Sequence, residues 1–169
     1  IIKIAKKHKL KVIEDTAQGL GSKFKGKWSG TIGNIGCFSF DSGKTLGTGE
    51  GGMVVSNNDI YGKRAFEYYD HGHQNNPKFP RGRDTRRRYG FNYRMTELQA
   101  AVGLAQMKKI DFSLKKQKKN YTNIKNGIKN NNFYSFRKFP KGTKHTFEAL
   151  VFNLPSKKDA KDLFKILVK

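Results

Sequence analysis

The sequence predicts an α/β protein, in which short buried strands alternate with amphipathic helices. Three apolar runs have the length of buried strands and are bounded by glycines or carboxylates, at 11–15, 36–40 and 52–56. Apolar residues recur at roughly helical spacing in three other segments, at 1–11, 58–69 and 96–110. The first strand ends in Glu14 and Asp15, and α/β proteins present functional groups at the carboxyl ends of their strands.

The first half of the chain alternates these elements with glycine-rich loops. A polar loop joins the first strand to the second and runs to Gly33, and the glycine-dense segment 43–52 separates the second strand from the third. The stretch 70–89 mixes His, Asn, Pro, Gly and Arg without periodicity. We therefore expect a long surface loop there.

The second half begins with a well-marked helix. Thr-Glu-Leu-Gln at 96–99 is a capping-box pattern, and Leu98, Val102 and Leu104 contribute to the apolar face behind it. A basic helix at about 112–129, a strand at 147–154 and a helix from 157 onward follow. Because the style of sequence changes after the capped helix, we place a domain boundary near residue 112, with one domain at 1–111 and another at 112–169.

The composition is strongly basic, with 35 Lys and Arg against 13 Asp and Glu and a formal net charge of +22. Such a charge is typical of nucleic-acid binding, because Lys and Arg neutralise phosphates. Here the charge is spread along the chain together with many Asn and Ile, a pattern that AT-rich coding also produces. A basic nucleic-acid-binding module is kept as a rival, motivated by Tyr89, Phe91 and Tyr93 beside the arginines of 81–88; we expect no nucleic-acid partner.

The single cysteine, Cys37, excludes an internal disulfide framework and a multi-cysteine metal site. His71 and His73 have no acidic or His partner at ligand spacing, so we expect no metal. No apolar stretch approaches transmembrane length and no signal peptide precedes the first helix. These features predict a soluble, cytoplasmic protein without a membrane partner.

The run Ser-Gly-Lys-Thr at 42–45 matches the end of a phosphate-binding P-loop, but two local features exclude that interpretation. The P-loop pattern requires a glycine five residues before its second glycine, and position 38 is Phe. It also requires a helix directly after the Lys-Thr pair, whereas 46–52 is too rich in glycine to begin one. The sequence therefore predicts another role for Lys44.

Four side chains match what pyridoxal 5'-phosphate requires of its host protein: Asp15, Gln18, Ser39 and Lys44. An aspartate at the pyridine nitrogen keeps that nitrogen protonated, and a lysine forms a Schiff base with the aldehyde. A hydroxyl such as that of Ser39 can donate to the phosphate. Taken singly, each residue has an ordinary structural explanation: a strand-end cap, a loop side chain, a strand side chain and a surface lysine, respectively. Their spacing and surroundings favour the cofactor.

Longer motifs surround these residues. Glu-Asp-Thr-Ala-Gln stands at 14–18, Gly-Asn-Ile-Gly-Cys-Phe-Ser-Phe at 33–40, and Lys-Thr-Leu-Gly-Thr-Gly-Glu-Gly-Gly-Met-Val at 44–54. A separate block, Gly-Phe-Asn-Tyr-Arg-Met-Thr-Glu-Leu-Gln-Ala-Ala-Val-Gly-Leu-Ala-Gln, stands at 90–106. In content, order and separation these blocks resemble the DegT/DnrJ/EryC1/StrS family of sugar aminotransferases. The resemblance covers about 5–125 and continues more weakly to the end.

The resemblance implies a fold and a role for each matching residue. The fold is that of the type I (aspartate aminotransferase-like) pyridoxal-phosphate-dependent transferases, with part of the large three-layer domain followed by the start of the small C-terminal α/β domain. Asp15 would face the pyridine nitrogen, Gln18 would lie near the ring and its phenolic oxygen, and Ser39 would contact the phosphate. Lys44 would carry the Schiff base and move protons. Asn92 would reach the cofactor phosphate of a neighbouring subunit, which implies a homodimer with shared active sites.

The activity that the resemblance implies is transfer of an amino group from an amino acid, glutamate in most of the family, to a keto-sugar. The sugar is expected to be nucleotide-linked, and the product to serve the synthesis of a surface polysaccharide or similar glycan. An eight-carbon sugar acid or a cyclitol is an alternative substrate. Because other parts of the family's chain have no counterpart here, we interpret the sequence as an internal fragment, inactive alone, with a non-catalytic remnant as a further alternative.

Overall fold

The computed structural model describes residues 1–129 and 133–168. Its helices and strands confirm the α/β class that the sequence predicts. In chain order they are α1 (Ile2–Lys7), β1 (Ile13–Asp15), β2 (Lys23–Phe24), β3 (Lys27–Trp28), β4 (Ile35–Ser39), β5 (Gly52–Val55), α2 (Asp59–Tyr69), the 3-10 turn η1 (Arg81–Arg83), α3 (Glu97–Met107), α4 (Ile110–Ile128), β6 (Ser135–Phe136), β7 (Thr143–Lys144), β8 (Phe152–Asn153) and α5 (Lys157–Leu167).

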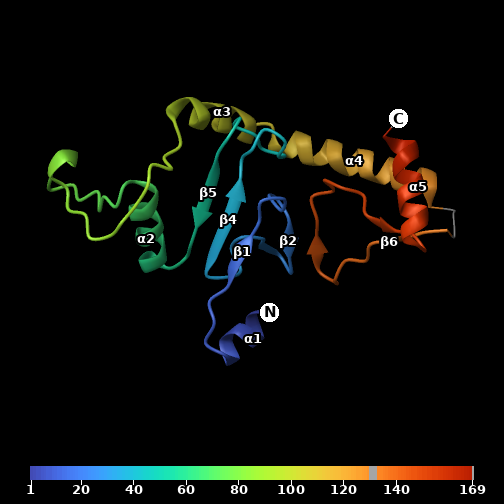
Figure 1. Cartoon of the computed structure of the whole chain (residues 1–169), viewed down its shortest axis with the longest axis horizontal. Helices are drawn as coiled ribbons and strands as arrows, with labels where there is room; N and C mark the ends of the chain where they lie inside the picture. The colour runs from blue at the N-terminus through green and yellow to red at the C-terminus, as the bar shows by residue number, and fades with distance from the viewer. Residues whose placement is uncertain (130–132, 169) are drawn as a thin grey trace.

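The central sheet has three strands in the order β1-β4-β5. β1 and β4 are parallel, with Asp15 opposite Cys37, whereas β5 runs antiparallel to β4. α2 lies beside β5, and α3 crosses the end of the sheet towards which β4 points (Figure 1). Because β1 and β4 run in the same direction, their last residues, Asp15 and Ser39, lie at the same edge of the sheet.

The helix boundaries follow local capping signals. The Thr96 side chain accepts from the Gln99 N–H, and the Gln99 side-chain oxygen accepts from the Thr96 N–H, so the predicted capping box is confirmed. α1 is shorter than the predicted 1–11, because Lys9 takes a positive φ of 54° and the Leu10 N–H donates back to the carbonyl of Ala5. That pair of features is a helix-ending Schellman motif.

The predicted glycine-rich loop before β4 contains a hairpin that the sequence pattern did not reveal. β2 and β3 pair through a two-residue turn in which Lys25 and Gly26 both have positive φ, as a type I′ turn requires. β7 adds to the other side of β2. A strand from the predicted second domain thus joins a hairpin of the first, and the boundary near residue 112 stays a prediction. The predicted strand at 147–154 is reduced to the two residues of β8.

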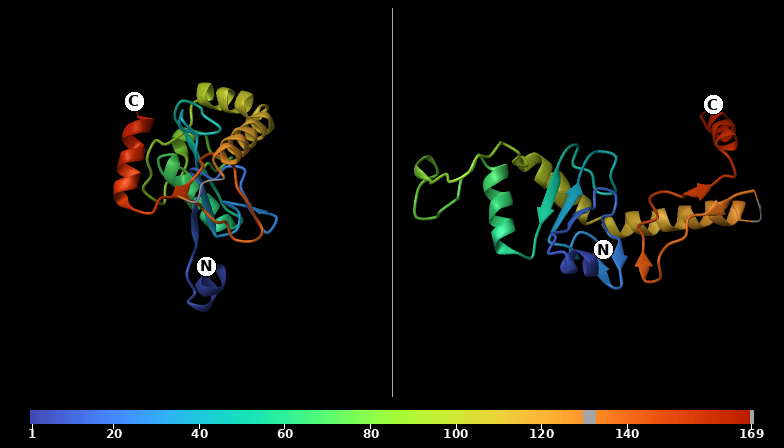
Figure 2. Two further views of the ribbon diagram at one scale, coloured as in Figure 1. Left: turned by 90° about the vertical axis from the view of Figure 1, so that its right-hand side faces the viewer. Right: turned by 60° about the horizontal axis from the view of Figure 1, so that its bottom comes forward.

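The molecule is elongated in Figure 1 and in the right-hand view of Figure 2, and it exposes more surface than a compact domain. Its accessible area is 13529 Å², against about 8,500 Å² for a compact monomer of 19.3 kDa. On the predicted apolar face of α3, Leu98 is 81% exposed and Leu104 is 69% exposed. The chain as described therefore leaves much of its apolar surface exposed, although a few apolar side chains such as Phe40 and Leu46 are buried.

Among the residues that the structure describes, none of the helices combines the length and the apolar character that a membrane crossing requires.

Candidate active site

A carboxylate next to the predicted Asp15 fixes the edge of the sheet. Glu14 accepts three backbone N–H groups with its two carboxylate oxygens, from Gly30 at 2.9 Å and from Ile32 and Gly33 at 2.6 Å each. These bonds tie the loop before β4 to the end of β1. Sequence reasoning missed this role, although a carboxylate beside a strand end and a glycine-rich loop further on are its visible signals.

Asp15 and Ser39 end the two parallel strands with unused bonding capacity. One oxygen of the exposed Asp15 accepts from the Ala17 N–H at 3.0 Å, and its other oxygen has no protein partner among the described residues. The half-buried Ser39 hydroxyl oxygen accepts from the Asp41 N–H at 3.3 Å, which leaves the hydroxyl hydrogen free to donate. The sheet edge thus presents a carboxylate and a hydroxyl on neighbouring strands.

Lys44 lies in the loop between β4 and β5, which is closed by backbone bonds across its base. The Phe40 N–H donates to Gly51 at 2.8 Å, and Ser42 to Gly49 at 2.9 Å. The Thr48 hydroxyl donates to the Glu50 carbonyl at 2.6 Å. Lys44 is half-buried as a residue, and within the part of the chain that the structure describes its amine has neither an ion pair nor a hydrogen bond. No helix follows Lys44 before α2, which confirms that the loop is not a P-loop.

Two helices pack on this loop from outside the sheet. The Gln117 side chain on α4 donates to the Thr45 hydroxyl at 3.1 Å. α3 approaches so closely that a Cβ added to Gly103 would lie 3.2 Å from the Thr48 methyl carbon. The loop that carries Lys44 is therefore held on two sides by elements far along the sequence.

The other two predicted residues are placed differently. Gln18 is exposed in the turn that follows β1, close in sequence to Asp15. Asn92 is exposed as well, but its backbone pairs with Asp70 at the end of α2. The structure thus places Asp15, Gln18, Ser39 and Lys44 at the ends of two neighbouring strands and in the turns that follow them, whereas Asn92 comes from a different element.

The segment 70–89 is a long, mostly exposed loop, as the sequence predicts, and isolated bridges fold it and the residues up to 94 into an antiparallel ribbon. Isolated bridges pair Asp70 with Asn92 and His73 with Arg86. The His71 N–H donates to Phe91 at 2.9 Å. The sequence did not indicate this pairing, because the bonds join residues 13 or more positions apart and produce no periodic pattern of apolar residues.

Buried acidic groups hold the ribbon together. Asp70, 3% exposed, accepts two hydrogen bonds from the Arg81 guanidinium, at 2.8 and 2.5 Å. These bonds lower the pKa of Asp70 well below its usual range, although burial opposes the shift. Asp84 lies 3.3 Å from the His73 ring. Burial raises the pKa of Asp84, but the N–H groups that face it and the His73 ring outweigh burial and lower it.

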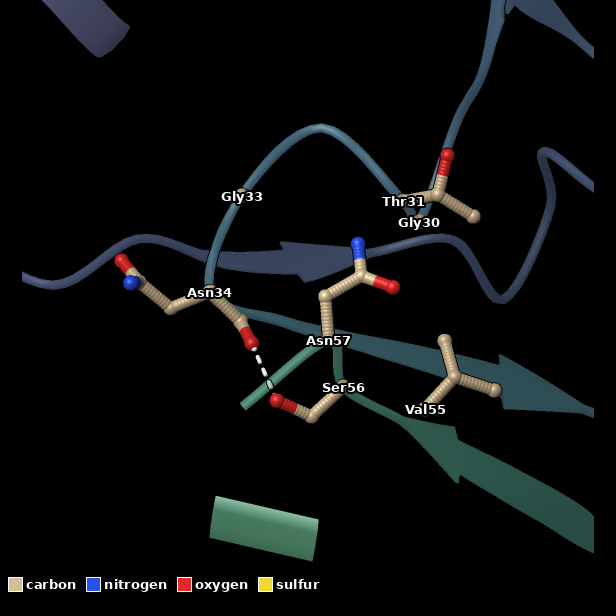
Figure 3. Close-up of a pocket in the computed structure, with 7 residues that line it drawn as sticks. All are labelled: Gly30, Thr31, Gly33, Asn34, Val55, Ser56 and Asn57. Atoms are coloured by element: carbon tan, nitrogen blue, oxygen red, sulfur yellow. Dashed lines mark hydrogen bonds between the residues drawn. The ribbon is translucent and has the colours of Figure 1, made fainter. Parts of the chain in front are cut away.

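A small cavity of about 70 Å³ lies away from these groups (Figure 3). It is lined where β4 begins and β5 ends, and the Ser56 hydroxyl donates to the Asn34 carbonyl across it at 2.7 Å. This end of β4 is opposite to the end that carries Ser39. The cavity is therefore not part of the candidate site.

The groups left free at the sheet edge fit a cofactor that carries a pyridine nitrogen, an aldehyde and a phosphate. A carboxylate oxygen of Asp15 can pair with a protonated pyridine nitrogen, and the Ser39 hydroxyl can donate to a phosphate oxygen. The unpaired amine of Lys44 is the group that reacts with an aldehyde. Each of the three complements a different part of pyridoxal 5'-phosphate.

A parallel strand pair followed by a loop with a free lysine fits the class of pyridoxal-phosphate-dependent transferases of the type I fold. A family model described as the DegT/DnrJ/EryC1/StrS aminotransferase family matches residues 1–169. The chain belongs to this family of pyridoxal-phosphate-dependent aminotransferases, as its motifs predict.

Similar proteins agree with this assignment. The chain is 40% identical over 121 residues to a GDP-perosamine synthase of Caulobacter vibrioides, a match that covers 68% of this chain and 29% of that protein. It is 38% identical over 152 residues to a GDP-perosamine synthase of Escherichia coli O157:H7, covering 87% of this chain and 38% of that protein. The structure of the Helicobacter pylori aminotransferase PseC superposes with a TM-score of 0.82 at 27% identity, over 95% of this chain and 43% of that one. The chain thus spans less than half the length of these relatives.

Proposed function

We propose that this protein is an aminotransferase that moves an amino group from an amino acid, glutamate, to a nucleotide-linked keto-sugar. The product would serve amino-sugar synthesis for a surface polysaccharide. One observation carries the proposal: the free amine of Lys44 is held in a loop fixed on two sides, next to the edge that presents Asp15 and Ser39. The family of the chain supports the reaction type.

In this proposal the residues of the site divide the work. Pyridoxal phosphate supplies an electron sink when it is bound. Lys44 would bind its aldehyde covalently and, once released, would move a proton at the substrate carbon. Asp15 would keep the pyridine nitrogen protonated, Gln18 would lie near the ring and its phenolic oxygen, and Ser39 would donate to the phosphate. Asn92 would reach the phosphate held by a second copy of the chain, so the proposed enzyme is a homodimer with shared sites.

The proposed substrate class rests on the relatives. Both GDP-perosamine synthases are named for a sugar attached to a nucleoside diphosphate. A keto-sugar linked to a nucleoside diphosphate is therefore the first substrate to test. An eight-carbon sugar acid and a cyclitol are the alternatives, and a substrate screen with a constant amino donor separates the three.

The covalent role of Lys44 is tested directly on the protein encoded by the complete reading frame. We expect pyridoxal phosphate to give an absorbance band near the visible edge, and borohydride to fix the cofactor on the Lys44 peptide, as read by mass spectrometry. Lys63→Arg, at an exposed position on α2, should label like wild type, and Lys44→Arg should not label. A label on another lysine, or none, would refute the proposed function.

A further inference from the structure

The side-chain amide of Asn92 has a defined orientation. Its Oδ1 accepts from the Arg94 Nε at 3.0 Å. Because a guanidinium has donors and no acceptor, the atom that faces it must be the amide oxygen. The NH₂ group therefore takes the other side. Within the described residues this NH₂ group has no protein partner, and Asn92 is exposed, so two N–H donors are available to a ligand.

Arg94 is itself held by a buried group. Its Nε lies 3.5 Å from the Asp70 carboxylate, and the Asp70 side chain is 4% exposed. Arg81 occupies both oxygens of the same carboxylate. A carboxylate paired in this way stays charged at neutral pH and keeps attracting Arg94.

Backbone bonds also fix Asp70 and Asn92 relative to each other. Asp70 and Asn92 form an antiparallel bridge. On either side of Asn92, the Phe91 N–H donates to Tyr68 at 2.8 Å and the Tyr93 N–H to Tyr69 at 2.9 Å. Asn92 is thus fixed along its backbone by the end of α2 and at its side chain by Arg94.

We propose that Arg94, held by Asp70, is a positioning residue that turns the NH₂ of Asn92 outward to donate to a phosphate oxygen. The inference rests on the proposed contact of Asn92 with the cofactor phosphate. Without Arg94 the amide can rotate and present its oxygen, which repels an anion. Arg94 acts through Asn92 and does not itself contact the phosphate.

The test compares ligands with and without the phosphate. The apo form of the protein encoded by the complete reading frame is titrated with pyridoxal phosphate and with pyridoxal, and binding is followed by absorbance. We expect Asn92→Ala to weaken pyridoxal phosphate binding about 10-fold or more, as loss of a charge-assisted hydrogen bond does, and to leave pyridoxal unchanged. Arg94→Ala should weaken pyridoxal phosphate binding about 3-fold to 10-fold, a part of the same effect.

A double-mutant cycle isolates the positioning role. The variant with both Asn92→Ala and Arg94→Ala should bind pyridoxal phosphate no more weakly than Asn92→Ala alone, because Arg94 acts only through Asn92. Arg94→Lys, which keeps a donor, should recover part of the loss. Arg83→Ala is the matched control, because the Arg83 side chain is exposed on the same ribbon and has no partner among the described residues.

The outcomes separate the inference from the function on which it rests. If Asn92→Ala leaves the preference for pyridoxal phosphate over pyridoxal unchanged, the proposed contact of Asn92 is wrong, whatever Arg94 does. If Asn92→Ala has its effect but Arg94→Ala has none, or the two losses add, positioning by Arg94 is overturned. Equal losses for both ligands in Arg94→Ala would show a general structural effect and also overturn it.

Discussion

Replacing Glu14 with glutamine changes one atom of the group that ties the loop before β4 to β1. In the structure Oε1 accepts from Ile32 and Gly33 at 2.6 Å each, and Oε2 accepts from Gly30 at 2.9 Å. A glutamine keeps one acceptor oxygen, which can retain the first two bonds. Its NH₂ then faces the Gly30 N–H, so that two donors meet and neither finds an acceptor.

The expected loss of unfolding free energy follows from the hydrogen bonds that Glu14→Gln removes or weakens. One hydrogen bond to a charged acceptor is lost, and such bonds contribute about 1.5–3 kcal/mol. The two retained bonds become neutral and are roughly halved in strength. The Glu14 side chain is only partly buried, so water can relieve some of the loss. We expect Glu14→Gln to lower the free energy of unfolding by about 2–3 kcal/mol.

Urea unfolding of the protein encoded by the complete reading frame measures this difference, followed by circular dichroism. Glu50→Gln is the control, because Glu50 is exposed and its side chain has no partner in the described chain. It should lie within about 0.5 kcal/mol of wild type. Equal stabilities for Glu14→Gln and Glu50→Gln would refute the anchoring role of Glu14.

Three further outcomes are expected. Gly72→Ala should lower the free energy of unfolding by about 2–4 kcal/mol in thermal or urea unfolding, because φ at Gly72 is +80° and the added Cβ would lie 2.1 Å from the Arg88 carbonyl oxygen. Gly82→Ala is the control and should cost far less, because an added Cβ there would have no atom within 4 Å. Pairing with Arg81 lowers the pKa of Asp70 in the folded protein. The difference in free energy of unfolding between wild type and Asp70→Asn should therefore be full above the ordinary Asp pKa of about 3.9 and shrink as pH falls below it. A free-energy difference independent of pH from 2 to about 7 would contradict this. Gln117→Ala should loosen the loop of Lys44 and speed amide hydrogen exchange there, because its bond to Thr45 is lost; unchanged exchange would count against it.

The sequence allowed good prediction where the signal is local. The capping box of α3 joins Thr96 to Gln99, and the cap of α2 joins Asn58 to Tyr61. Each spans four residues, so both helix starts were predictable. The strands β1, β4 and β5 were predictable as short apolar runs between turn signals. Motif resemblance then added the family, which no single element could have shown.

Contacts between distant residues were not predictable in the same way. Glu14 bonds to residues 16 to 19 positions away, and Gln117 reaches Thr45 across 72 positions. The ribbon at 70–94 has the same character, because its order comes from backbone pairing and from Asp70, whose neighbours in sequence give no hint of burial. Register and pairing of this kind depend on the whole fold.

The candidate site shows a division between the groups that hold it and the groups that remain free. Both carboxylate oxygens of Glu14 accept hydrogen bonds from backbone N–H groups, and the hydroxyl of the buried Thr48 donates to the Glu50 carbonyl within the same loop. Asp15, Ser39 and Lys44 each keep a donor or acceptor without a protein partner in the described chain. A site whose supporting bonds are made before a ligand arrives loses little entropy when it binds one. The same division applies to Asn92: the bond from Arg94 holds its amide oxygen and leaves its NH₂ group free, just as backbone bonds hold the loop of Lys44 and leave its amine free.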